Sequence, residues 1–271
     1  MNFGEWKDLI LLALGFLLSI GAGIVGAFIQ RRLDRRGERR PLNQLLNFGP
    51  DGLLFIFPHR DSSPEAILPR TSTEDFLAMN NFISALLNVG WTRKIGVRDT
   101  GRVTESDKRR NLVIICSPKS NSIAGTFQKE LRSVHPNAFA FESEGDRVFI
   151  SDGDNARYQS RSYQQVEDYL RSGTARPDLP SKQYEDFAVV TKVASPWNDK
   201  NIVVWVAGIR GIGTWGAAEC IKKEWRQIYD QLPRDRKDCD FSALLKIEYD
   251  NCDITSVEVR RVELLGTKKV V

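Results

Sequence analysis

The chain has 271 residues, 27% of them charged, and a formal net charge of +4. Six Arg and two acidic residues lie in the segment 31–40, a surplus of four that equals the whole net charge. The rest of the chain is therefore close to neutral, which excludes broad electrostatic binding of nucleic acid. Two His and four Cys with no C-x-x-C pair argue against a zinc site, and we expect no metal and no cofactor.

The first feature along the chain is an uninterrupted apolar run from Leu9 to Ile29. A helix of about 20 residues crosses the roughly 30 Å hydrocarbon core of a bilayer, so the run predicts a single transmembrane span. Basic residues gather on the cytoplasmic side of a span. We therefore expect an inner-membrane protein with its N-terminus outside and its C-terminal domain in the cytoplasm.

Two alternatives to this anchor are a cleaved signal peptide and a buried core helix. A signal peptide carries its positive charge before the apolar run, whereas here the charge follows it. A core helix of this length would be interrupted by polar positions. The basic flank is instead expected to meet anionic lipid head groups, and its cations are Arg31, Arg32, Arg35, Arg36, Arg39 and Arg40.

Small residues recur at every fourth position of the predicted span: Gly15, Ser19, Gly23 and Ala27. Such a ridge lets two helix backbones approach closely in lipid, and it favours self-association. The alternative is that Gly and Ala are simply common in membrane helices.

The predicted span and its basic flank divide the chain into three regions: residues 1–30 as the anchor, 31–52 as a basic juxtamembrane segment and linker, and 53–271 as one cytosolic domain.

Alternating apolar runs and helical periodicities predict an α/β fold for that domain. The expected strands are 53–57, 91–97, 111–116, 184–194 and 201–207, a hairpin of 138–142 with 147–151, and a closing pair around 244–249 and 257–264. The expected helices are 71–90, one carrying Ile123, Phe127 and Leu131, a short one at 162–170, and 215–232. We expect a Rossmann-like, three-layer domain with a mostly parallel central sheet and antiparallel edge strands. Thr71 and Glu74 form the pattern of a capping box at the start of the first helix.

The strongest candidate for a ligand site is the turn Gly208–Thr214, between a buried strand and a helix. Glycines allow close approach of a phosphate, and free N–H groups at a helix start favour negative charge. The residues expected to take part are Gly208, Arg210, Gly211, Gly213 and Thr214. Their spacing matches neither the Walker signature nor the dinucleotide fingerprint. The alternative is a tight turn with no ligand.

A second turn, Ser117–Ser122, follows another predicted buried strand. Ser117, Lys119, Ser120 and Asn121 could bind a sugar or phosphate, although ordinary helix capping by Ser or Asn explains the same pattern. Both turns should lie at the carboxyl edge of a parallel sheet, where open α/β sheets hold ligands.

Candidates for catalysis are fewer. Glu219, beyond the first turn of the last helix, could reach a sugar as nucleophile or base. Its alternative role is that of a helix-surface acid near the positive end of the helix dipole. His59 follows a predicted strand and could line the site.

The span, together with the stretches Leu68–Asp75, Asn111–Asn121 and Ala207–Thr214, resembles the SLOG and nucleoside deoxyribosyltransferase-like domains of prokaryotic conflict systems. This resemblance implies a Rossmann-like nucleotide-sensing domain in antiviral defence. The deoxyribosyltransferase pattern needs a second catalytic carboxylate that is not obvious here.

The leading hypothesis is therefore a membrane-anchored effector in which a nucleotide-like ligand or a protein partner clusters the spans. A tethered enzyme acting on a nucleoside's glycosidic bond and a ligand-free scaffold are the alternatives.

Overall fold

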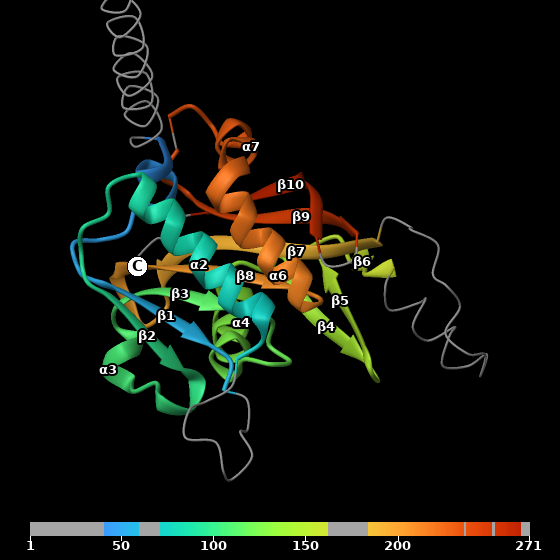
Figure 1. Cartoon of the computed structure of the whole chain (residues 1–271), viewed down its shortest axis with the longest axis horizontal. Coiled ribbons are helices and arrows are strands. Elements are labelled where there is room, and N and C mark those ends of the chain that lie inside the picture. Colours follow the sequence, from blue (N-terminus) through green and yellow to red (C-terminus); the bar gives the residue numbers. More distant parts are fainter. Residues whose placement is uncertain (1–40, 60–70, 162–183, 236, 251–252, 267–271) are drawn as a thin grey trace, which may run out of the picture.

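A computed structural model describes residues 41–59, 71–161, 184–235, 237–250 and 253–266 (Figure 1). Four predicted features lie outside these ranges: the span, its ridge of small residues, its basic flank at 31–40 and the helix at 162–170. Within them, no helix combines the length and apolarity that crossing a membrane requires.

The domain is a mixed α/β structure built on a seven-stranded sheet with the order β10-β9-β7-β8-β3-β1-β2. The strands are β1 (Leu53–Phe57), β2 (Ile95–Asp99), β3 (Asn111–Ile115), β7 (Tyr184–Ser195), β8 (Asn198–Gly208), β9 (Asp240–Asp250) and β10 (Asp253–Leu265). A separate three-stranded sheet contains β4 (Ala140–Glu144), β5 (Arg147–Ser151) and β6 (Arg157–Gln159). The predicted hairpin is confirmed as β4 and β5, which pair antiparallel around Gly145.

The sheet divides into a parallel half and an antiparallel half. β8, β3, β1 and β2 are mutually parallel, whereas β7, β9 and β10 each run antiparallel to their neighbours. We expected a mostly parallel centre with antiparallel strands at the edges. The parallel strands are present, but the antiparallel strands β7, β9 and β10 all lie on one side of them and make up nearly half of the sheet. The reason is local: β7 and β8 are joined by a tight hairpin after Ser195, and a short hairpin connection can join only antiparallel strands.

The two faces of the sheet carry separate apolar cores. Helices α2 (Thr73–Asn88), α6 (Gly211–Glu219) and α7 (Trp225–Gln231) cover one face, and α4 (Ser122–Val134) with the small sheet covers the other (Figure 1). Trp205 of β8 is fully buried in the second core, where it contacts Phe127 and Phe141. Two short helices, η1 (Thr100–Arg102) and α3 (Glu105–Lys108), connect β2 to β3.

Helix boundaries differ from the prediction at two starts. α2 is capped by Ser72 rather than Thr71, because the Ser72 hydroxyl accepts the N–H of Asp75 at 3.1 Å. The last helix begins at Gly211, four residues early, so the glycine pattern supplies its first turn. Between α6 and α7 the chain forms a π-helix, η2 (Cys220–Glu224).

Residues 41–46, which were assigned to the linker, are helical and belong to the folded domain. Leu42, Leu45 and Leu46 are buried in the same core as α2 and α7. Figure 1 shows this short blue helix beside the C-terminal end of α2. The folded unit therefore includes residues well before β1.

Candidate functional site

The two predicted turns are neighbours at the carboxyl edge of the parallel strands. β3 and β8 pair in register, and the N–H of Cys116 donates to the carbonyl of Val206 at 3.0 Å. The ends of β1 and β2 lie at the same edge, because Phe57 pairs with Asp99. The start of β7 reaches it as well, since Ala188 pairs with Gly208.

The glycine turn is packed tightly against itself. The N–H of Gly208 donates to the hydroxyl of buried Thr214 at 2.9 Å. A Cβ on Gly208 would lie 2.3 Å from the backbone N of Thr214, and a Cβ on Gly211 would lie 3.1 Å from the side chain of Glu74 in α2. Close packing within the protein therefore accounts for these two glycines.

The start of α6 is occupied by a carboxylate of the protein itself, that of Asp186 in β7. Its Oδ2 accepts the N–H of Arg210 at 2.9 Å and that of Gly213 at 3.0 Å, while Oδ1 accepts the N–H of Phe187 at 2.9 Å. A Cβ on Gly213 would lie 2.4 Å from this Oδ2. The amides that the sequence assigned to a phosphate are thus bound to Asp186.

Burial sets the ionisation of Asp186, which has no exposed surface. Desolvation raises its pKa to about 6, against the opposing effect of the backbone N–H bonds and of the positive charge on Arg210. Sequence reasoning missed this residue. Its signal was an acid directly before the apolar run 187–190 of a predicted strand, and a charge is rarely fully buried unless it is paired or hydrogen-bonded.

The backbone of the second turn is fixed by hydrogen bonds of Asn121, whose side chain is fully buried. Its Oδ1 accepts the N–H of Ala124 and so caps α4, and its Nδ2 donates to the carbonyls of Ile115 at 2.8 Å and Ile56 at 3.5 Å. Asn121 thus fastens β1, β3 and α4 together. Cys116, just before this turn, has a left-handed φ of 85°.

Two of the predicted ligand residues in this turn point outward. Lys119 and Ser120 are exposed, whereas Ser117 is buried and its carbonyl accepts the N–H groups of Ser120 and Asn121. Arg210 in the neighbouring turn is half-buried. Of the side chains expected to bind a ligand, those accessible at this edge are therefore Lys119, Ser120 and part of Arg210, framed by buried groups that fix the backbone.

The adjacent strand ends carry a histidine and a carboxylate. His59 Nδ1 lies 3.1 Å from Oδ1 of Asp99, whose other oxygen lies 3.4 Å from Nε of Arg102. The His59 side chain is 43% exposed, whereas that of Asp99 is 4% exposed. A buried carboxylate that orients a solvent-accessible imidazole is an arrangement suited to proton transfer.

Glu219 does not lie at this edge. It ends α6, about 12 Å along the axis from the first residue of that helix. Asn81 of α2 donates to its Oε2 at 2.5 Å, Lys223 pairs with its Oε1, and Lys222 donates to Asn81 at 2.9 Å. The structure thus gives Glu219 a role in joining α2 to α6.

A cavity of about 1030 Å³ opens at the opposite edge of the sheet, and buried Lys192 and Asp240 are in its wall. Desolvation lowers the pKa of Lys192 and raises that of Asp240, and their charged groups lie 3.6 Å apart. The Lys192 ammonium also donates to the carbonyls of Asp238 and Cys239. These bonds tie the loop before β9 to β7, which is a structural use of the lysine.

Within the described ranges, no group of three or more His, Cys, Asp or Glu side chains is placed to hold a metal ion. Comparison with known proteins found no matching family model, no matching curated protein and no matching solved structure.

Proposed function

We propose that this chain is a membrane-anchored effector whose cytosolic, Rossmann-like domain senses a ligand carrying phosphate and ribose, and that it acts in antiviral defence. The observation that carries the proposal is the adjacency of the Ser117–Ser122 and Gly208–Thr214 turns on paired parallel strands. Ligands of open α/β sheets bind at this edge, where neighbouring strand ends meet.

The chemistry of the edge favours an anionic ligand. Lys119 offers an exposed ammonium and Ser120 an exposed hydroxyl. Because Asp186 already binds the amides at the start of α6, we assign the ligand's phosphate to Lys119 and Ser120. Arg210 stands in the turn that follows the neighbouring strand β8, and we assign it as a second cation of the site. The glycine turn then serves as a rigid wall of the site.

We propose that the effector response is the clustering of the membrane spans. Ligand binding, or a protein partner at the same edge, would bring cytosolic domains together and let the small-residue ridges of the spans pack. A modest gain in association between domains suffices, since anchoring already concentrates the copies in one plane.

A second candidate is a membrane-tethered enzyme that acts on a nucleoside's glycosidic bond. The His59–Asp99 pair favours it, since it places a possible general base at the ligand edge. The position of Glu219 argues against the mechanism first expected, because that carboxylate is engaged by Asn81 and Lys223. A scaffold without a small-molecule ligand would lack both activities.

A thermal-stability screen of the full-length protein in detergent tests the proposal. Nucleoside mono-, di- and triphosphates, cyclic nucleotides and free ribose phosphates would each be added at about 100 times a micromolar Kd, which stabilises a binder by about 2.7 kcal/mol. We expect at least one compound to raise Tm, with the rise lost in Lys119→Ala/Ser120→Ala and kept in the matched control Lys129→Ala.

Two results would contradict the proposal. No shift across the panel favours the scaffold. A shift accompanied by release of free base, abolished by His59→Gln, favours the enzyme.

A further inference from the structure

The edge of the sheet opposite the ligand site is where the described chain begins. After the helix at residues 41–46, the backbone crosses this edge at Gly49, whose N–H donates to Asn111 Oδ1 at 3.2 Å. A Cβ on Gly49 would lie 2.9 Å from the carbonyl of Lys200, and a Cβ on Gly52 would lie 2.8 Å from that of Lys94. The starts of β1, β2, β3 and β8 therefore surround this segment.

Exposed cations outnumber exposed acids around the same segment. Along residues 49–52 and the starts of β1, β2, β3 and β8, the exposed basic residues are Arg93, Lys94, Arg109 and Lys200, and the exposed acids are Asp51 and Asp199. Exposed Glu130 and Asp238 line the larger cavity on the other side of Asn47. Half-buried Arg110 lies 3.9 Å from buried Asp107 and is partly neutralised by it. We call this surface the amino-edge patch; it has a positive surplus on a domain that is otherwise close to neutral.

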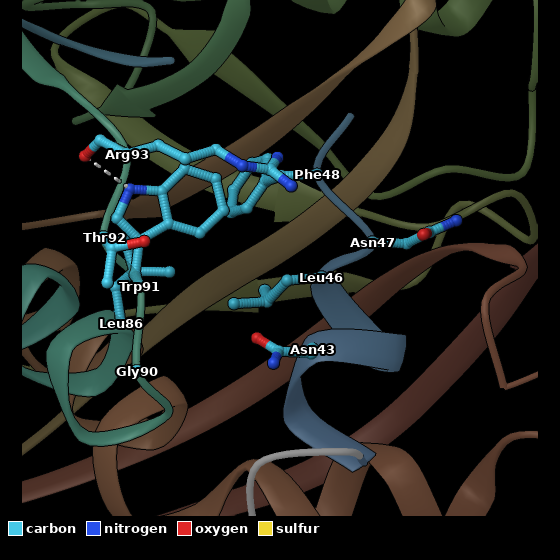
Figure 2. A pocket seen from close by; sticks show the side chains of 9 residues that line it. All are labelled: Asn43, Leu46, Asn47, Phe48, Leu86, Gly90, Trp91, Thr92 and Arg93. Atoms are coloured by element: carbon cyan, nitrogen blue, oxygen red, sulfur yellow. Dashed lines mark hydrogen bonds between the residues drawn. The ribbon is translucent and has the colours of Figure 1, made fainter. Parts of the chain in front are cut away.

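Beside the patch lies a cavity of about 340 Å³ between residues 43–48 and 86–93 (Figure 2). Its floor is apolar, with Leu46 and Leu86 buried, and the half-buried rings of Phe48 and Trp91 meet edge to face at 5.7 Å. The Arg93 guanidinium lies 5.1 Å from the Trp91 ring centroid and also donates to the carbonyl of Gly49.

The mouth of this cavity combines the side chains that favour a lipid–water interface. Arg93, Asn43 and Asn47 are the polar side chains among the residues labelled in Figure 2 that carry an amide or a charge, and Trp91 donates its Nε1–H to the Arg93 carbonyl at 3.1 Å. Leu87, the next residue in α2 after Leu86, is 59% exposed. Tryptophan, arginine and exposed leucine are the residues with which proteins engage head groups and the upper acyl chains.

The chain itself limits how far this surface can be from a bilayer. If the span ends at Ile29, as the proposed function holds, 12 residue steps lead to Pro41. Twelve steps cover about 40 Å fully extended and about 18 Å as a helix. The six arginines in that stretch would be attracted to anionic head groups, which shortens the distance further.

We propose that the amino-edge patch docks on the anionic surface of the membrane that anchors the chain, and that the cavity beside Trp91 and Arg93 takes a phospholipid headgroup. This inference rests on the proposed anchor. The tether makes weak attraction sufficient, because it keeps the patch at high effective concentration near the lipid. Docking in this way turns the carboxyl edge, with Lys119 and Ser120, away from the bilayer and toward the cytosol.

Quenching of tryptophan fluorescence by brominated lipids tests the docking in the full-length protein. The protein is reconstituted in nanodiscs of brominated phosphatidylcholine, with or without about one-third phosphatidylglycerol, at ionic strength low enough to limit screening. Trp91→Phe gives the share of quenching that belongs to Trp91. We expect this share to be present in the anionic discs and reduced in the neutral ones.

Charge reversal then tests the patch. Each cation near an anionic surface contributes about 1 kcal/mol, so Arg93→Glu/Lys94→Glu should weaken docking by about tenfold or more. Lys94→Glu/Lys200→Glu should weaken it comparably while leaving the lining of the cavity intact. The matched control Lys129→Glu/Arg260→Glu, with the same change of charge on α4 and β10, should keep the Trp91 quenching.

The two proposals fail differently. Protein released from membranes by alkaline carbonate refutes the anchor, and the docking argument with it. Protein that stays in the membrane but shows no Trp91 quenching, or equal quenching in neutral discs, refutes the docking alone.

Discussion

The turns after β8 and β3 occupy equivalent places on neighbouring strands but are constructed in opposite ways. The glycine turn after β8 is filled by the protein itself, with Asp186 bound to its amides and Thr214 beneath Gly208. In the turn after β3, the buried side chain of Asn121 fixes the backbone, and the side chains of Lys119 and Ser120 are exposed to solvent. A glycine pattern thus shows that something approaches the backbone closely, without showing that this is a ligand.

The largest expected effect breaks the glycine turn. Gly208→Ala places a Cβ 2.3 Å from backbone that cannot move aside, and we expect a loss of about 4 kcal/mol or more in the free energy of unfolding. The matched control is Gly145→Ala, at a φ of 58° with open space around it, which should cost only about 1 kcal/mol. Urea denaturation measures both. Equal losses at the two positions would show that the turn is not tightly packed.

The next prediction concerns the pH dependence that Asp186 confers. Its pKa is about 6 in the folded protein and about 3.9 in an unfolded chain, so the folded state binds the proton more tightly. The cost of the buried charge is complete above pH 6, is relieved as the pH falls through that value, and is absent below about pH 4.

Asp186→Asn removes this titration. Relative to the variant, the wild type should therefore gain about 1 kcal/mol of stability between pH 7 and pH 5. Chemical denaturation of both proteins at the two pH values measures the difference. Parallel pH profiles would mean that Asp186 is not titrating as a buried acid.

A smaller effect sharpens the comparison at the other turn. Cys116 has a left-handed φ, so Cys116→Gly relieves strain of about 1–2 kcal/mol while losing a buried thiol of similar value. We expect stability within about 1 kcal/mol of the wild type. Cys116→Val, with a β-branched side chain in the same conformation, should cost at least about 2 kcal/mol. Thermal unfolding of the pair distinguishes strain from simple packing.

The smallest expected effect is that of Glu219→Gln. The variant loses an ion pair with Lys223, whose side chain is 63% exposed, and keeps a hydrogen-bond acceptor for Asn81. We expect a loss of no more than about 1 kcal/mol and an unchanged response to nucleotides. A large loss of nucleotide response at preserved stability would return Glu219 to the ligand site.

Periodicity and turn residues were sufficient to locate most elements of the described domain. The apolar runs around Phe55, Ile114 and Val204 are indeed strands, because a fully buried strand leaves a continuous hydrophobic signature. The adjacency of the two turns was also predictable, since parallel strands end at one edge. The short strand β6 and the early start of α6 were missed, because three residues or one glycine-rich turn carry little periodicity.

The contents of the site were less predictable than its position. Asp186 reaches the start of α6 because β7 pairs antiparallel with β8, and its contact with Arg210 lies at the far end of this long hairpin, where the exact register of the two strands decides which residues meet. The engagement of Glu219 by Asn81 likewise joins residues 138 positions apart. Which of the two turns is open to a ligand therefore depends on contacts between residues far apart in the sequence.

The most direct test of the account is Förster transfer between differently labelled full-length copies in liposomes, recorded as the nucleotide panel is added. We predict that a nucleotide which raises Tm also raises transfer in the wild type but not in Lys119→Ala/Ser120→Ala. Transfer that no nucleotide changes, or that rises equally in the variant, would contradict ligand-driven clustering through the carboxyl edge.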